Sequence, residues 1–120
     1  MTHHDFRRIA LGMEGAIEAA HMGHPDFRAR GRIFATLHAD LKTGMVKLTP
    51  EQQEAFVESA PAVFMPVKGG WGRGGATNVR LEAATARALR HALATAWRNV
   101  APGSLTTVAS RSKGGPSSAR

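Results

Sequence analysis

The segment Thr49-Pro50-Glu51-Gln52 constrains the fold of this chain more than any other local pattern. Threonine is a good N-cap, proline suits the first helical position, and Gln52 can close a capping box. Strand-like segments stand on either side of this helix start, at residues 45–48 and 63–67. The pattern therefore predicts a short helix, ending near Ala60-Pro61, that is inserted between strands of an α+β fold.

The flanking sequence supplies a helix at each end and strands between them. Thr2-His3-His4-Asp5 is a second capping-box pattern, and the last helix is expected from about Thr85 to Val100. Strand patterns cover residues 16–22, 27–37 with a break at Gly31, and 77–82, with a turn expected at Gly23-His24-Pro25-Asp26. We predict a two-layer sandwich in which an antiparallel sheet packs one face on the two terminal helices and leaves the other face exposed.

The length of 120 residues allows one domain, which we place at residues 1–102. Residues 103–120 are rich in Ser, Thr, Gly, Lys and Arg and offer little to bury. We expect a disordered basic tail there.

Positive charge is concentrated in the second half of the chain. Residues 1–60 hold 7 Lys or Arg against 8 acidic residues, whereas residues 61–120 hold 9 against Glu82 alone, and the net charge is +7. Clustered cations attract polyanions, so the asymmetry indicates an anionic partner. A surplus of charge that serves solubility is the alternative interpretation.

Several classes of site have no support in the sequence. Without cysteine there is no disulfide and no cysteine-ligated metal site. The six histidines form no set of three or four ligands, and no nucleophile motif or carboxylate pair is present. The polar N-terminus lacks a signal-peptide pattern and no apolar run could span a bilayer. We expect a cytoplasmic monomer that is not an enzyme and holds no metal or cofactor.

The most unusual segment is Lys68-Gly69-Gly70-Trp71-Gly72-Arg73-Gly74-Gly75. Glycine lets a backbone approach a ligand closely, a tryptophan ring can stack on a base, and Lys68 and Arg73 can pair with phosphates. The segment would suit a flexible wing that contacts nucleic acid. Alternatively, Trp71 folds back over the core.

Other cations could extend this surface along the exposed sheet. The candidate nucleic-acid-binding residues are Lys68, Trp71, Arg73, Arg80, Lys47, Arg32 and Arg30. Phosphate contacts would supply most of the affinity, and sequence specificity should be weak because no recognition helix is evident. Two other functions stay open: a module that binds a protein partner, and a regulatory domain in which Trp71 covers a small-molecule pocket.

Several blocks of sequence, in order, resemble the MmcQ/YjbR family over roughly residues 4–101. The blocks are His24-Pro25-Asp26-Phe27-Arg28, Gly31-Arg32-Ile33-Phe34-Ala35, Val46-Lys47-Leu48-Thr49-Pro50-Glu51-Gln52, Pro66-Val67-Lys68-Gly69-Gly70-Trp71-Gly72, Thr77-Asn78-Val79-Arg80-Leu81 and Ala96-Trp97-Arg98. The resemblance implies a frataxin-like (CyaY-like) fold and the DNA-binding role with which the family is commonly labelled.

The same fold raises the question of iron, and the sequence argues against it. Frataxin-like iron sites depend on acidic residues crowded on the first helix. This chain offers Asp5 and Glu14 there, interrupted by Arg7 and Arg8. Hard cations need several converging oxygen ligands, which two separated carboxylates do not supply.

Overall fold

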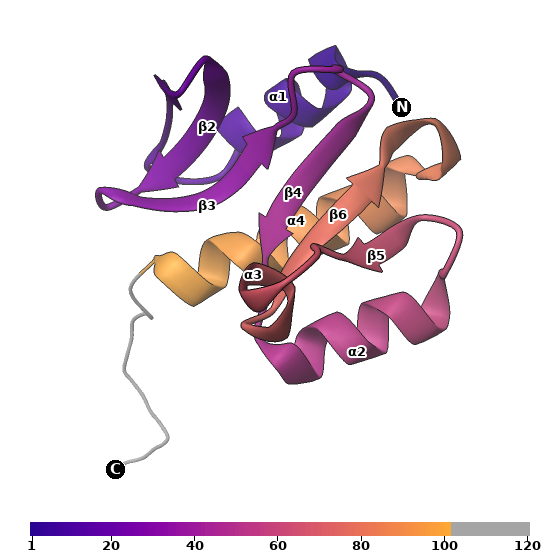
Figure 1. Cartoon of the computed structure of the whole chain (residues 1–120). Helices are drawn as coiled ribbons and strands as arrows, with labels where there is room; N and C mark the ends of the chain where they lie inside the picture. Colours follow the sequence, from indigo (N-terminus) through magenta and orange to yellow (C-terminus); the bar gives the residue numbers. More distant parts are fainter. Residues whose placement is uncertain (102–120) are drawn as a thin grey trace, which may run out of the picture.

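The computed structural model describes residues 1–101, so the tail expected over residues 103–120 lies outside the described part. Within these residues the chain forms an α+β fold with a six-stranded antiparallel sheet and four helices (Figure 1). The elements in chain order are α1 (His3–Leu11), β1 (Ala16–His21), β2 (His24–Ala29), β3 (Arg32–Leu37), β4 (Thr43–Lys47), α2 (Pro50–Ser59), β5 (Phe64–Pro66), α3 (Gly70–Arg73), β6 (Ala76–Arg80), a 3-10 turn (Leu81–Ala83) and α4 (Ala86–Val100).

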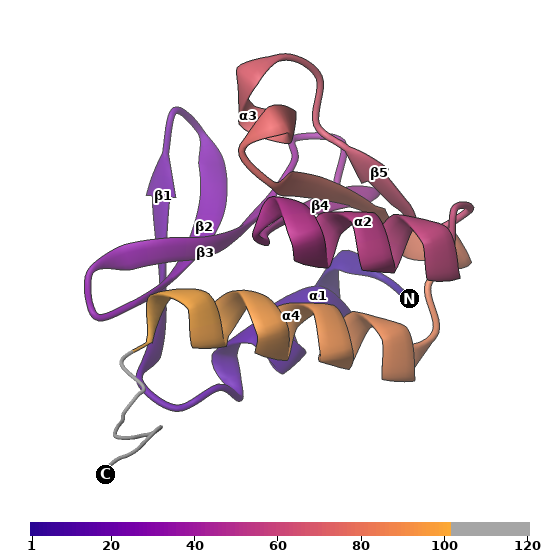
Figure 2. The same cartoon turned by 90° about the horizontal axis from the view of Figure 1, so that it is seen from below.

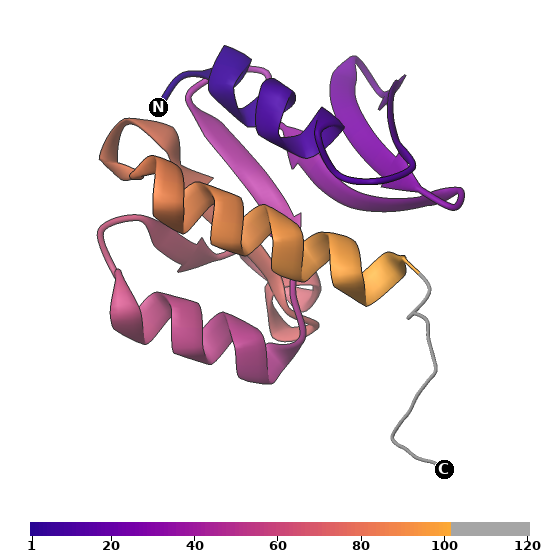
Figure 3. The same ribbon diagram turned by 180° about the vertical axis from the view of Figure 1, so that it is seen from behind.

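The strands lie in the order β1-β2-β3-β4-β6-β5, so β1 and β5 are the edges of an open sheet. Helices α1, α4 and α2 lie on one side of the sheet (Figure 3). The short helix α3 lies on the other side, and the β1–β2 hairpin rises toward that same side (Figure 2). The predicted arrangement of one covered and one exposed face is confirmed, except that α3 stands over part of the exposed face.

The helix starts follow the sequence signals. The hydroxyl of Thr2 accepts from the amide of Asp5, whose carboxylate accepts from the amide of Thr2, and Thr49 and Gln52 form the same reciprocal pair. Thr85 caps α4 by accepting from the amide of Ala88. None of the helices within residues 1–101 has the length and the apolar run that crossing a lipid bilayer requires.

The core lies between the sheet and its covering helices. Its largest fully buried side chains are aromatic or branched and come from every layer: Phe6, Phe27, Phe34, Phe64, Leu37, Leu81, Leu89 and Leu93. Alternation along β6 buries Thr77 and Val79 on this side, as the pattern predicts. Helix α4 supplies Leu89 and Leu93 from its apolar face and so closes the core.

The prediction of a turn at Gly23-His24-Pro25-Asp26 is wrong, because the turn lies earlier in the chain. The turn consists of Met22 and Gly23, whose φ angles of 51° and 79° are those of a two-residue type I′ hairpin loop. The strand β2 then begins at His24, which pairs with His21 across the turn. Pro25 is tolerated because the pairing of β2 with β3 starts only at Asp26, and the sequence His24-Pro25-Asp26 is extended rather than turned.

Candidate functional site on the open face of the sheet

Strand alternation decides which residues reach the uncovered side of the sheet, here called the open face. Along β4, Val46 faces the core, whereas Met45 and Lys47 face the open side. A bulge in β3 leaves Phe34 without a partner in β2. The extra residue lets the adjacent Phe34 and Ala35 both face the core, while Ile33 and Thr36 both line the open face.

The glycine-rich segment forms one helical turn, α3, rather than the flexible wing that the sequence suggested. A Cβ on Gly72 would collide with the backbone carbonyl of Val67, so only glycine permits this close approach. The C-terminal part of the turn and the start of β6 are also braced from α2. The side-chain amide of Gln53 donates to the carbonyls of Gly72 and Ala76, each at 3.0 Å.

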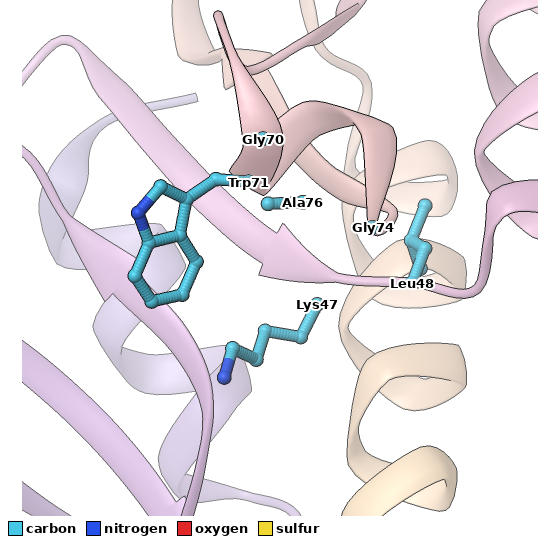
Figure 4. A pocket seen from close by; sticks show the side chains of 6 residues that line it. All are labelled: Lys47, Leu48, Gly70, Trp71, Gly74 and Ala76. Atoms are coloured by element: carbon cyan, nitrogen blue, oxygen red, sulfur yellow. The ribbon is translucent and has the colours of Figure 1, made fainter.

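Helix α3 presents Trp71 to solvent. Its indole is 68% exposed, so the alternative in which Trp71 covers the core is wrong. Figure 4 shows the ring projecting from α3 with the Lys47 side chain reaching out beside it. The Lys47 ammonium lies 5.6 Å from the ring centroid, within the range of a cation–π contact. A hollow of about 660 Å³ is lined by Lys47, Trp71 and backbone of the glycine-rich segment.

A second hollow, here called the basic hollow, lies between the β2–β3 hairpin and the end of α4. It has a volume of about 450 Å³, and three of its lining residues are cations, namely Arg28, Arg32 and Lys47. Asn99 also lines it and connects α4 to β4, because its side-chain amide donates to the carbonyl of Lys47 at 3.0 Å. Lys47 therefore lies in both hollows and joins them.

A buried carboxylate holds Arg28 in place. Asp26 has no exposed surface and accepts two hydrogen bonds from Arg28, at 2.7 Å and 3.1 Å. These hydrogen bonds lower the pKa of Asp26 below its ordinary value of 3.8, against the effect of burial, and a hydrogen bond with His21 lowers it further. An ionised carboxylate only accepts, so the ring Nδ1 of His21, 2.6 Å away, carries the proton.

A third hollow lies on the open face next to Asp26 and Arg28. The hollow, here called the histidine pocket, has a volume of about 270 Å³. It is lined by His21, His24, Ile33, Thr36, His38, Met45, Lys47, Val67, Trp71 and Ala76. The Nε2 atom of His38 lies 2.9 Å from Oδ1 of Asn78, whereas Nδ1 of His24 is buried and has no hydrogen-bond partner within residues 1–101.

The three hollows adjoin one another and are together called the groove here: the basic hollow shares Ile33 and Lys47 with the histidine pocket and extends to Asn99 and Val100 at the end of α4. No aspartate or glutamate of the described chain is among the lining residues. Within the same residues, no group of three or more His, Asp or Glu side chains is arranged to hold a metal ion. The groove therefore has a cationic and aromatic lining suited to an anion that carries a flat ring.

The structure brings together only part of the predicted nucleic-acid-binding set. Lys47, Trp71 and Arg32 share the groove. Lys68 and Arg73 are exposed but line none of its hollows.

The other two predicted residues lie away from the groove. Arg30 sits at the tip of the β2–β3 hairpin with a φ of 56°. Arg80 pairs with Thr43, while Lys47 pairs with Ala76 at the other end of the same two strands. Four residues of strand separate the two cations, roughly 13 Å.

Sequence reasoning missed the three histidines and gave Arg28 no role of its own in the site. The histidines come from β1, β2 and the end of β3, and only the strand register places them together. The available signal was the two-residue turn at Met22-Gly23, which puts His21 opposite His24. For Arg28 the signal was its spacing from Asp26, because residues two apart in a strand share a face.

Comparison with known proteins agrees with the fold and with the resemblance noted in the sequence. No curated protein matches the chain. A crystal structure of a Deinococcus radiodurans protein, described by its DUF419 domain, has a TM-score of 0.66 and 18% identity and covers 80% of this chain and 75% of its own. The sequence model of the YjbR family matches residues 11–99, most of the described chain. The chain therefore belongs to the YjbR family.

Proposed function

We propose that this protein is a non-catalytic nucleic-acid-binding domain that holds its ligand in this groove, which runs from the open face of the sheet to the end of α4. One observation carries the proposal: an exposed tryptophan stands beside Lys47 in a groove that also holds Arg28 and Arg32 and has no acidic lining residue within residues 1–101. Tryptophan stacking and cation–phosphate pairing are the two contacts that bind nucleic acid without reading its sequence.

The cations of the groove differ in how much charge they can offer to phosphate. Arg28 is paired with Asp26, so the two together are close to neutral. Arg32 and Lys47 make no ion pair with another described residue. We therefore assign the phosphate contacts mainly to Arg32 and Lys47, with Arg28 fixing the shape of the basic hollow between them.

The proposal includes weak sequence specificity, because α3, the helix that projects on the open side, has four residues and is too short to serve as a recognition helix in a major groove. It also keeps the expectations of a cytoplasmic monomer without enzymatic activity. The frataxin-like assignment of the fold stays a prediction from the family resemblance, and nothing in the proposed binding mode depends on it.

The test is a salt titration of two matched double variants. Arg32→Ala with Lys47→Ala removes both groove cations, whereas Arg87→Ala with Arg90→Ala removes two exposed cations of α4 and leaves the groove intact. Fluorescence anisotropy with labelled DNA and RNA measures the affinity at several salt concentrations. We expect micromolar binding by the wild type, and a salt slope that falls by about one for each cation–phosphate pair that the groove variant can no longer form.

The control variant has the same net charge as the groove variant, so equal losses of affinity in both would mean that the overall charge, and not the groove, attracts the ligand. A third variant, Lys68→Ala with Arg73→Ala, tests the two cations beside Trp71. We expect a smaller loss of affinity there, because neither side chain lines the groove. Binding to neither DNA nor RNA at low salt would rule out the proposed function.

A further inference from the structure

The histidine pocket has a shape and a lining that the phosphate contacts leave unexplained. Its volume of about 270 Å³ lies just below the range of about 300–1,000 Å³ that is usual for drug-sized ligands. Ile33, Met45 and Val67 give it apolar walls. Trp71, which also lines the hollow shown in Figure 4, places an aromatic ring at its edge. A cavity of this size and lining suits a single flat ring system.

One residue that lines the pocket has a ring nitrogen that lacks a partner. Nδ1 of His24 is buried, yet no group within residues 1–101 makes a hydrogen bond to it. Buried polar atoms nearly always have a partner, and an exception calls for an explanation such as a bound molecule. The neighbouring histidines differ in this respect, since His21 is paired with Asp26 and His38 with Asn78. His24 is thus the histidine of the pocket whose ring nitrogen Nδ1 has no partner among the described residues.

The position of the pocket connects it to the phosphate-binding cations. Lys47 lines the histidine pocket, the basic hollow and the hollow beside Trp71. A ring in the pocket would therefore have a cation at its side and the basic hollow next along the groove. In a strand of nucleic acid each base is attached to a charged backbone, so a ring site beside cations fits a base together with its phosphate.

We infer that the histidine pocket takes one unpaired base of a single-stranded nucleic acid, with Trp71 against the base and His24 beside its edge. The inference rests on the proposed function and deepens it by naming the ligand as single-stranded. A base inside a duplex is stacked on both faces and paired at its edge, so it reaches such a pocket only by leaving the stack. Duplex DNA would then offer the groove its phosphates alone.

The experiment compares four ligands on the full chain carrying Trp97→Phe, which leaves Trp71 as the sole tryptophan. The ligands are an oligothymidylate, an abasic deoxyribose-phosphate strand of the same length, the duplex of that oligonucleotide, and thymidine monophosphate. We expect the oligothymidylate to quench Trp71 emission and to bind about tenfold more tightly than the abasic strand, because base stacking contributes in addition to phosphate pairing.

The ligand series separates this inference from the proposed function. Equal affinity for the oligothymidylate and the abasic strand would overturn the base pocket and leave phosphate-led binding standing. Tighter binding of the duplex, or binding of thymidine monophosphate as tight as that of the oligomer, would also overturn the inference. If none of the strands bound, the proposed function and the inference would both fail.

A matched pair of substitutions locates the effect. Met45→Phe adds a ring inside the pocket, whereas Met65→Phe makes the same change on β5, where Met65 pairs with Asn78 outside the pocket lining. We expect Met45→Phe to lower the affinity for oligothymidylate about tenfold, to the level of the abasic strand, and to leave abasic binding unchanged. Met65→Phe should change neither. Full base preference in a folded Met45→Phe protein, checked by circular dichroism, would contradict the inference.

Discussion

The two faces of the sheet are built from alternate residues of the same strands, yet they differ in chemistry. In β4, Val46 faces the helices and is fully buried, and the next residue, Lys47, faces the groove. The covered face is closed by phenylalanine, leucine and alanine. The open face carries histidine, arginine, lysine and an exposed tryptophan. The comparison teaches that most of the core packing lies on one face, which leaves the other free to carry polar, cationic and aromatic residues.

The largest expected effect comes from comparing the loss of stability when a side chain is removed from each face. Phe27→Ala removes a fully buried ring that packs near Phe6 in the core, and we expect it to lower the free energy of unfolding by about 3–5 kcal/mol. Lys47→Ala, on the open face, should change the same quantity by less than about 0.5 kcal/mol. Urea denaturation of both variants measures the difference. Similar decreases in both variants would show that the open face also carries the stability of the fold.

Asp26 sharpens the comparison, because it is a fully buried charge on the open side. Asp26→Asn weakens the bonds to Arg28 and His21, so the free energy of unfolding should fall by about 1–3 kcal/mol near neutral pH. The folded-state pKa of Asp26 is lowered below 3.8, so its contribution is present above that pH and is lost as the pH falls through the lower folded-state value.

The pH dependence of unfolding provides the check on Asp26. Wild-type stability should fall as the medium is acidified below about pH 4, and the slope should be shallower in Asp26→Asn. Asp5, with a pKa lowered to about 2 by its bonds at the start of α1, and Asp40, with a lowered pKa, keep part of the slope in both proteins. Parallel urea-unfolding curves against pH would show that Asp26 contributes nothing to the acid sensitivity.

The smallest expected effect comes from the two tryptophans. Trp97 is half-buried, and its ring Nε1 donates to the carbonyl of Glu14 at 2.8 Å, so Trp97→Phe should lower the free energy of unfolding by about 1 kcal/mol. Trp71→Phe removes no hydrogen bond and no packing against the core, and its stability should match the wild type. Thermal denaturation of the two variants compares them directly. A larger decrease in stability for Trp71→Phe would mean that α3 depends on its indole.

Sequence reasoning succeeded where a structure depends on neighbouring residues. The caps at Thr2 and Thr49 are local hydrogen-bond patterns, and both predicted helix starts are confirmed. Sequence reasoning failed where the local structure depends on contacts with residues outside the segment. The turn of α3 exists because Gly72 fits against Val67 and because Gln53 of α2 reaches across to it, and neither relation can be read from spacing.

The candidate site shows the same division. Trp71 and Lys47 were identified from residue type, but their proximity comes from α3 standing over β4. The histidines carried no local signal for a shared pocket, because their register depends on a type I′ turn and a bulge. The sequence therefore indicated the kinds of side chain in the groove better than it indicated which residues line it.

The brace from Gln53 has a consequence for how quickly a ligand can bind. One amide group bonds the carbonyls of Gly72 in α3 and Ala76 at the start of β6, so the segment that presents Trp71 is held to α2 without a ligand. Binding then loses little conformational entropy in this segment, and more of the contact energy remains as affinity. No closing step has to precede tight contact at Trp71, so the association rate should be governed by diffusion and electrostatic attraction.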